Sequence, residues 1–210
     1  MSARRLTRSD FIRLVREDWI THGRDWTRPG FRALIVYRFG VWLTGLRYRI
    51  VRGVLARLQL VMYRYVRAHY GIELPPTAKV GRRLLIAHQS GIVIHTNAEI
   101  GDDCMIRHNV TIGARSQKRW WEAPKLGNGV QVGCGASILG DITVGDDVII
   151  GANAVVAANV PSGVLVVVQP PRMIPKQSEK ATQRASDLYA YVGRQEAIDS
   201  ADLPPQNPVP

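Results

Sequence analysis

A six-residue repeat runs through residues 73–174 and constrains the fold of this chain more than any other feature. Each hexad opens with an aliphatic residue, a glycine often follows, and a small or aliphatic residue comes four positions after the opener. The openers are Val80, Ile86, Ile92 or Ile94, Ile100, Ile106, Ile112, Leu126, Val132, Ile138, Val144, Ile150 and Val156. Such a period is typical of a parallel β-helix, in which each hexad supplies one short strand and one corner. We therefore predict a mainly β fold with three hexads in each triangular coil.

Two irregularities interrupt the repeat. The first is a slip of two residues at Ile92/Ile94. The second is the long gap between the openers Ile106 and Val132, which exceeds one coil by eight residues. The excess matches the polar stretch RSQKRWWE, so we predict a loop over 115–123 that projects from the coil.

Stacking the coils places His88, His108, Cys134 and Ala152 at one corner, because each comes two residues after an opener of the same column. Successive coils of a parallel sheet lie about 4.8 Å apart. A positioned imidazole can remove the proton of a hydroxyl as that hydroxyl attacks a thioester, and small side chains leave room for a thin pantetheine arm. The corner therefore predicts a site for acyl transfer with His88 as the base. His95 belongs to another column.

Residues 1–72 predict a small α-helical N-terminal domain. Ser9 is a plausible N-cap for the first helix, a breaker follows at 27–30, and two further helices are expected near 31–47 and 49–70, with Gly71 as a stop. The apolar stretch Phe31 to Leu46 is too short and, with Arg38 inside it, too charged to span a bilayer. Residues 175–210 are polar and Pro-rich, and we expect a tail there.

The positive charge of the chain lies entirely in its first third. Residues 1–70 hold 15 arginines, no lysine and four acids, whereas the remainder is neutral. The arginines predict peripheral contact between basic amphipathic helices and a membrane; the alternative is that they solvate a surface or pair across an oligomer interface. No nucleic-acid motif is present, so no nucleic-acid partner is expected. Two cysteines and the lack of a signal peptide predict a cytoplasmic protein, placed at the inner face of the membrane if that contact forms.

The repeat region also resembles a known family. Residues 72–94, 110–113, 124–156 and, more weakly, 160–174 are similar to serine O-acetyltransferases and their relatives in bacterial polysaccharide clusters, and GFRALIVYRFGVWL (30–43) resembles the helical region of that family. The resemblance implies a left-handed coil, acetyl-CoA as co-substrate, no metal, and a homotrimer with active sites between subunits. In the serine enzymes such trimers pair.

The resemblance also implies roles for individual residues. His88 falls at the catalytic base and Glu73 at the carboxylate that partners it, while His108 is a second catalytic candidate. The expected contacts to acetyl-CoA are Ala114, Cys134 and Ala152 along the pantetheine arm and Arg172 at the phosphates. The expected contacts to the acceptor follow from the place of the projecting loop and are Arg115, Trp120 and Trp121. The alternatives for the two tryptophans are that they cover the CoA arm or pack at a subunit interface.

Departures from the serine enzymes bear on the acceptor. Ala123 stands where those enzymes carry a second histidine, and Ala87 where they carry an aspartate, whereas IRHNVTIG (106–113) resembles the colanic-acid-type polysaccharide acetyltransferases. We therefore predict an acetyl-CoA-dependent O-acetyltransferase that acts on a sugar hydroxyl in exopolysaccharide synthesis. The alternatives are a serine O-acetyltransferase of cysteine synthesis and a non-catalytic or metal-binding β-helix.

Overall fold

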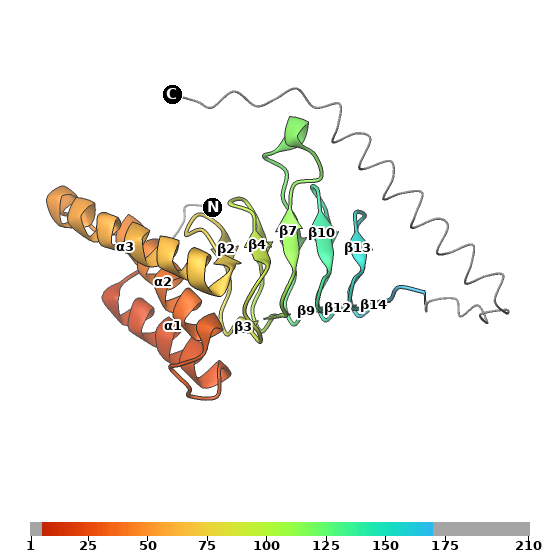
Figure 1. Ribbon diagram of the computed structural model, residues 1–210, viewed down its shortest axis with the longest axis horizontal. Coiled ribbons are helices and arrows are strands. Elements are labelled where there is room, and N and C mark those ends of the chain that lie inside the picture. The colour runs from red at the N-terminus through yellow and green to blue at the C-terminus, as the bar shows by residue number, and fades with distance from the viewer. Residues whose placement is uncertain (1–5, 170–210) are drawn as a thin grey trace, which may run out of the picture. The chain divides into compact units, whose positions relative to one another are not determined.

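The computed structural model describes residues 6–169, which begin with three helices and continue as short parallel strands (Figure 1). The helices are α1 (Arg8–Thr21), α2 (Pro29–Thr44) and α3 (Arg49–Tyr70). The strands are β1 (Ile72–Glu73), β2 (Lys79–Val80), β3 (Leu85–Ile86), β4 (Ile92–Ile94), β5 (Glu99–Ile100), β6 (Met105–Ile106), β7 (Thr111–Gly113), β8 (Lys125–Leu126), β9 (Gln131–Val132), β10 (Ser137–Leu139), β11 (Thr143–Val144), β12 (Ile149–Ile150), β13 (Val155–Val156) and β14 (Leu165–Val166). A short 3₁₀ helix, η1 (Gln117–Arg119), lies between β7 and β8.

The strands form three parallel sheets, one for each face of a triangular coil. Their orders are β1-β4-β7-β10-β13, β2-β5-β8-β11 and β3-β6-β9-β12-β14, so each strand pairs with the third strand after it, except that β12 pairs with β14. The predicted column is present, since Ile106 pairs in register with both Ile86 and Val132, and Val132 pairs with Ile150. These openers are buried and fill the interior of the coil. The sequence prediction of a parallel β-helix is confirmed.

The first helix begins at a different cap from the one predicted. Thr7, not Ser9, is the N-cap: its hydroxyl accepts a hydrogen bond from the Asp10 N–H, while the Asp10 carboxylate accepts one from the Thr7 N–H. This reciprocal capping box requires an acidic or amide residue three positions after the cap, which Thr7 has. Gly71 ends α3 as expected, with a left-handed φ of 61°.

A buried ion pair fastens the helices to the first coil. The Arg38 guanidinium donates to Asp18 at 2.9 and 3.3 Å, and both side chains are almost fully buried. Arg38 also donates to the carbonyl oxygens of Val80 and Gly81. Burial raises the pKa of Asp18, and the hydrogen bonds from Arg38 oppose that rise. Arg38 thus joins α2 to α1 and to the first coil. Helix α2 lies in the interior of this segment, since nine of its residues are buried.

The helices and the β-helix belong to one compact unit that extends to Val168. Helix α2 packs against β3 and α3 packs against β1, so the helices lie beside the first coils (Figure 1). The predicted boundary at 72/73 falls within β1 and stays a prediction. The predicted tail (175–210) and Arg172 lie outside the described residues. Among residues 6–169, no helix has the length and apolarity needed to cross a membrane.

Candidate active site

The corner that follows β3, β6, β9 and β12 carries the predicted site residues. The carbonyl oxygen of His108 accepts a hydrogen bond from Gly135 N–H at 3.0 Å, and that of Cys134 accepts one from Asn153 N–H at 2.8 Å. Asn109, Gly135 and Asn153 all adopt left-handed backbone conformations, with φ between 55° and 73°. The structure therefore stacks His108, Cys134 and Ala152 as the repeat predicted.

The corner of His88 is larger than those below it. Ala87 N–H donates to the Ile106 carbonyl, which aligns His88 with His108 when residues are counted from β3. Asn109 N–H, however, donates to the carbonyl of Ser90, which aligns Ser90 with His108 when residues are counted from β4. The two-residue slip thus lies in residues 88–91, where Ser90 and Gly91 are left-handed. His88 stands in this expansion and is exposed.

The carboxyl end of α3 supports the expanded corner. The carbonyl oxygen of Tyr70 accepts a hydrogen bond from Ser90 N–H at 2.8 Å, and that of Gly71 accepts one from Ile92 N–H at 3.0 Å. The last carbonyls of a helix lack partners within the helix, so the coil supplies them here. The expansion is therefore tied to the helical segment that precedes β1.

The imidazoles of His88 and His108 contact each other. Their ring centroids lie 5.6 Å apart with an interplanar angle of 77°, an edge-to-face arrangement. His88 is exposed and His108 is half-buried. The His88 side chain is therefore open to solvent, while the neighbouring imidazole packs against its ring.

Glu73 is not bonded to His88 in the part of the chain that the structure describes. Glu73 pairs in register with Val93 on β4. The Glu73 charge adds to burial in raising the pKa of Tyr63, so this carboxylate lies close enough to influence Tyr63 on α3. The partnership of Glu73 with His88 stays a prediction.

A hollow of about 210 Å³ lies beside the same column. Its lining includes Cys134 and Ala152, two of the predicted contacts to the pantetheine arm, together with Gly133, Gly151 and Arg107. Arg107 was not singled out from the sequence, although its place directly after the opener Ile106 turns it outward beside His108. It supplies a positive charge at a site expected to receive a phosphorylated cofactor. Ala114 lies elsewhere, after β7.

A loop that contains η1 projects between β7 and β8 (Figure 1). Trp120 and Trp121 are exposed and pack edge to face with ring centroids 6.3 Å apart. Asn97 donates a hydrogen bond to the Trp121 carbonyl at 3.0 Å, which fixes the loop to the corner that follows β4. Ala123 at the end of the loop is buried.

The loop and His88 occupy different corners of one protomer. His88 precedes β4, whereas Ala114 and the loop with Arg115 follow the carboxyl end of β7 in the same sheet. The three-residue strands of that sheet separate the two corners by at least about 10 Å. His95 shares the corner of the loop, where its Nδ1 accepts a hydrogen bond from Asn97 N–H.

His22, which carried no signal in the sequence, is a buried support of the site. Its Nε2 accepts a hydrogen bond from Ile86 N–H at 3.3 Å, so its Nδ1 carries the proton and donates to the Asp18 carbonyl at 2.7 Å. Burial lowers the pKa of His22, which keeps the ring neutral. Because Ile86 lies two residues before His88, this contact fixes the strand that leads to the proposed base.

The described residues contain no group of three His, Cys, Asp or Glu side chains that could hold a metal ion.

Comparison with known proteins places the chain among acetyltransferases. The model of the family described as bacterial transferase hexapeptide (six repeats) matches residues 123–158. A serine acetyltransferase of Helicobacter pylori (strain ATCC 700392 / 26695) is 43% identical over 148 residues, which cover 70% of this chain and 82% of that protein. A putative colanic acid biosynthesis acetyltransferase of Escherichia coli K12, WcaB, is 41% identical over 151 residues, which cover 71% and 93%.

Solved structures agree with these sequence matches. Serine acetyltransferase isoform 3 of Entamoeba histolytica in complex with cysteine has a TM-score of 0.65 at 25% identity, covering 84% of this chain but only 64% of that one. Serine acetyltransferase of Brucella abortus strain S19 in complex with coenzyme A has a TM-score of 0.66 at 27% identity, covering 80% and 68%.

These likenesses confirm the predicted left-handed β-helix with a helical N-terminal region. They also confirm the resemblance to serine acetyltransferases and colanic-acid-type enzymes on which the prediction of an acyltransferase was based. This chain therefore belongs to the hexapeptide-repeat acetyltransferases, in the group that contains the serine acetyltransferases.

Proposed function

We propose that this protein transfers an acetyl group from acetyl-CoA to an acceptor hydroxyl, with His88 as general base. The observation that carries the proposal is the exposed His88 imidazole in its expanded corner, in contact with His108. The hollow lined by Cys134 and Ala152 lies along the same column of corners. A base and a slot for a thin cofactor arm are the two elements that the reaction requires.

The proposed reaction is direct transfer. The acceptor oxygen attacks the thioester carbonyl as its proton passes to a ring nitrogen of His88, giving a tetrahedral oxyanion. Collapse of that intermediate breaks the carbon–sulfur bond, and the imidazolium returns the proton to the departing CoA sulfur. Glu73 is proposed to stabilise the imidazolium, as a carboxylate does when it partners a catalytic histidine. Arg107 and Arg172 are proposed to bind CoA phosphates.

The prediction of a sugar acceptor is not confirmed, and serine is the first candidate. The relatives from Helicobacter pylori and Synechococcus elongatus and the solved structure from Entamoeba histolytica carry the name serine acetyltransferase, which favours the alternative. A sugar hydroxyl remains the second candidate because of one structural observation. Ala123 stands at the position where the serine enzymes carry a second histidine. Its side chain is a buried methyl group, which has no polar atom to hold an amino acid. The WcaB match also spans 93% of that protein.

An assay of CoA release tests both parts of the proposal. Purified protein is incubated with acetyl-CoA and either L-serine or an exopolysaccharide-derived oligosaccharide, and free thiol is followed. His88→Ala should lower kcat about 10²-fold or more, the usual contribution of a general base. His69→Ala is the matched control, because His69 is an exposed histidine on α3 that contacts Tyr65. Wild-type kcat in His88→Ala would refute the proposed base.

We further propose that the active site forms between protomers of a trimer. Within one protomer, His88 and the loop with Trp120 and Trp121 lie at separate corners, and a neighbouring protomer is needed to bring them together. Protomers with His88→Ala and protomers lacking residues 116–121 should each be inactive alone. Mixed trimers of the two should recover part of the activity, because some of their sites contain both parts. Mixed trimers without activity, or a monomeric mass in light scattering, would contradict the proposal.

A further inference from the structure

Helix α3 has an apolar face that nothing in the described residues covers. Of its 22 residues only Val66 is buried. The large apolar side chains that are more than two-fifths exposed are Ile50, Val51, Val54, Leu58, Leu60, Val61 and Tyr65. Scattered exposed apolar residues are ordinary, but a contiguous row of them marks an interaction surface.

The row is contiguous because its spacing is helical. Val51, Val54, Leu58, Val61 and Tyr65 follow one another at intervals of three and four residues, so they form a single stripe along α3; we call these five residues the α3 stripe. At about 100° per residue, Arg57 and Arg64 fall roughly 40° and 60° from Val61. Both arginines therefore border the same edge of the stripe, and their long stems can lie along it while the guanidinium groups reach outward.

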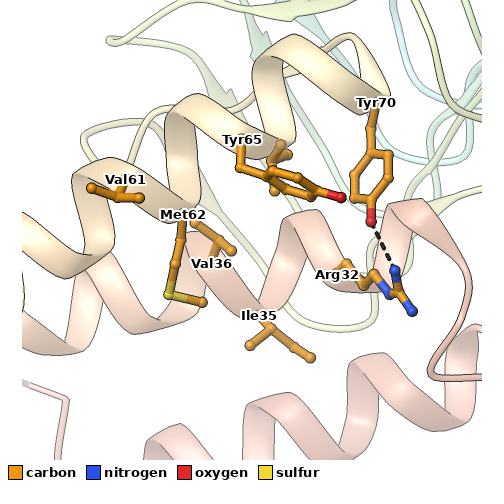
Figure 2. A pocket seen from close by; sticks show the side chains of 8 residues that line it. Arg32, Ile35, Val36, Val61, Met62, Tyr65 and Tyr70 are labelled. Atoms are coloured by element: carbon orange, nitrogen blue, oxygen red, sulfur yellow. Dashed lines mark hydrogen bonds between the residues drawn. The ribbon is translucent and has the colours of Figure 1, made fainter.

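The stripe continues into a groove between α2 and α3 (Figure 2). The groove has a volume of about 410 Å³, and its walls include Ile35 and Val36 of α2 with Val61 and Met62 of α3. Polar groups gather at one end, where the Arg32 guanidinium donates to the Tyr70 hydroxyl at 2.8 Å (Figure 2). A channel that is apolar along its length and cationic at one end has the polarity of a hydrocarbon chain with an anionic head group.

The charge of the helices determines which partner fits. Residues 26–72 contain nine arginines and no acidic residue. The α3 arginines, which are Arg49, Arg52, Arg57, Arg64 and Arg67, form no ion pair with any residue in 6–169. If two copies of the chain met face to face through α3, arginines would oppose arginines, and residues 26–72 offer no carboxylate to neutralise them. An anionic lipid surface satisfies both the charge and the apolar stripe.

We propose that α3 lies flat on an anionic lipid bilayer, with the α3 stripe in the boundary between head groups and acyl chains. The neighbouring arginines bind lipid phosphates, and the α2–α3 groove receives part of an acyl chain. This proposal does not depend on the identity of the acceptor. It places the peripheral membrane contact expected from the sequence on one face of one helix.

Vesicle flotation of the full chain tests the proposal. Vesicles of phosphatidylcholine with about one-third phosphatidylglycerol should carry the protein upward at physiological salt, whereas pure phosphatidylcholine should not. Arg57→Gln with Arg64→Gln should weaken binding about 25-fold, because each arginine near an anionic surface contributes a factor of roughly five. Arg8→Gln with Arg16→Gln removes the same charge from exposed positions of α1 and should change binding much less.

The apolar part is tested by Val54→Ser with Leu58→Ser. Both side chains are exposed, so this variant should fold, keep wild-type kcat with a free acceptor, and lose vesicle binding. Absence of flotation with the anionic vesicles would overturn the proposal, and so would equal binding by the serine variant, which would indicate attraction to polyanions in general. If the serine variant lowers the mass of the assembly in light scattering and leaves flotation unchanged, the stripe is a contact between copies and the proposal is wrong.

Discussion

Two glycines in helices offer a paired test of how the helical segment is packed against the coil. Gly30 lies at the start of α2, and a Cβ built there would overlap the carbonyl oxygen of Ile86 and lie 3.1 Å from His22 Nε2. Gly53 lies inside α3, and a Cβ built there would meet nothing within 4 Å. The same Gly→Ala change is therefore expected to have opposite effects at the two positions.

The magnitudes follow from the surroundings of each glycine. Alanine at an unobstructed helical position stabilises by about 0.5–1 kcal/mol, because glycine loses more backbone freedom on folding. Gly53→Ala should gain this amount. Gly30→Ala gains at most the same, but it forces the backbone of β3 and the His22 ring to move, and overpacking of this kind costs about 1–3 kcal/mol. The net expectation for Gly30→Ala is a loss on the order of 1–2 kcal/mol.

Urea unfolding at one fixed protomer concentration measures both variants, because the stability of an oligomer depends on concentration. Gly30→Ala should also lower kcat, since the displaced Ile86 lies two residues before His88, whereas Gly53→Ala should leave kcat unchanged. If Gly30→Ala is as stabilising as Gly53→Ala, α2 does not pack against β3 as described, and the reasoning fails.

Two further predictions concern the buried groups that join the helices to the coil. Arg38→Met leaves the Asp18 carboxylate buried without its partner and should cost about 3–5 kcal/mol in urea unfolding; Asp18→Leu combined with Arg38→Met should recover much of that loss, and an additive double variant would argue against the pair. His22, which faces Asp18 and Arg28, has a pKa below its ordinary 6.5 because of burial, so the unfolded chain binds the proton more readily. The contribution of neutral His22 to the free energy of unfolding is therefore complete above about pH 6.5 and is lost as the pH falls below that value. His22→Gln should flatten this part of the plot of unfolding free energy against pH. An unchanged plot would contradict the assignment.

The fold could be predicted because each hexad of the sequence forms one strand and one corner of the coil. A buried residue must recur once per hexad, so the openers identify the strands, and counting by threes gives the in-register pairs such as Ile86 with Ile106. The cap of α1 was not predicted correctly, because Thr7 and Ser9 both have capping hydroxyls. The pairing of Thr7 with Asp10 determined which of them begins the helix.

The candidate site was predictable only where it follows the repeat. His108, Cys134 and Ala152 stack because their coils are regular, and the residue count is then sufficient. His22 could not be found in this way, since its contact with Ile86 joins residues 64 positions apart and arises from packing between two segments. The expansion at 88–91 was visible as a slip of two residues, but its support by the end of α3 depends on where that helix ends in space.

The connection between α3 and the corner of His88 makes Gly71 a test of whether the helix positions the proposed base. Gly71 is left-handed, a conformation that costs most other residues about 1–2 kcal/mol, and a Cβ there would lie 3.0 Å from the Ser90 Cα. Gly71→Ala should therefore disturb the carbonyls that hold Ser90 and Ile92 and lower kcat, while vesicle binding through the α3 stripe should persist.

The expected result for Gly71→Ala, a lower kcat with vesicle binding retained, bears on the membrane proposal. A helix that lies on a bilayer and whose last carbonyls are bonded to the corner of His88 would hold that corner at a fixed place relative to the lipid surface. An acceptor attached to lipid would then meet the base directly, whereas a small dissolved acceptor such as serine would gain nothing from the arrangement. Anionic vesicles should consequently raise the rate with a lipid-linked acceptor and leave the rate with serine unchanged. Equal rates with and without vesicles for a lipid-linked acceptor would contradict the idea that α3 positions His88 relative to the lipid surface.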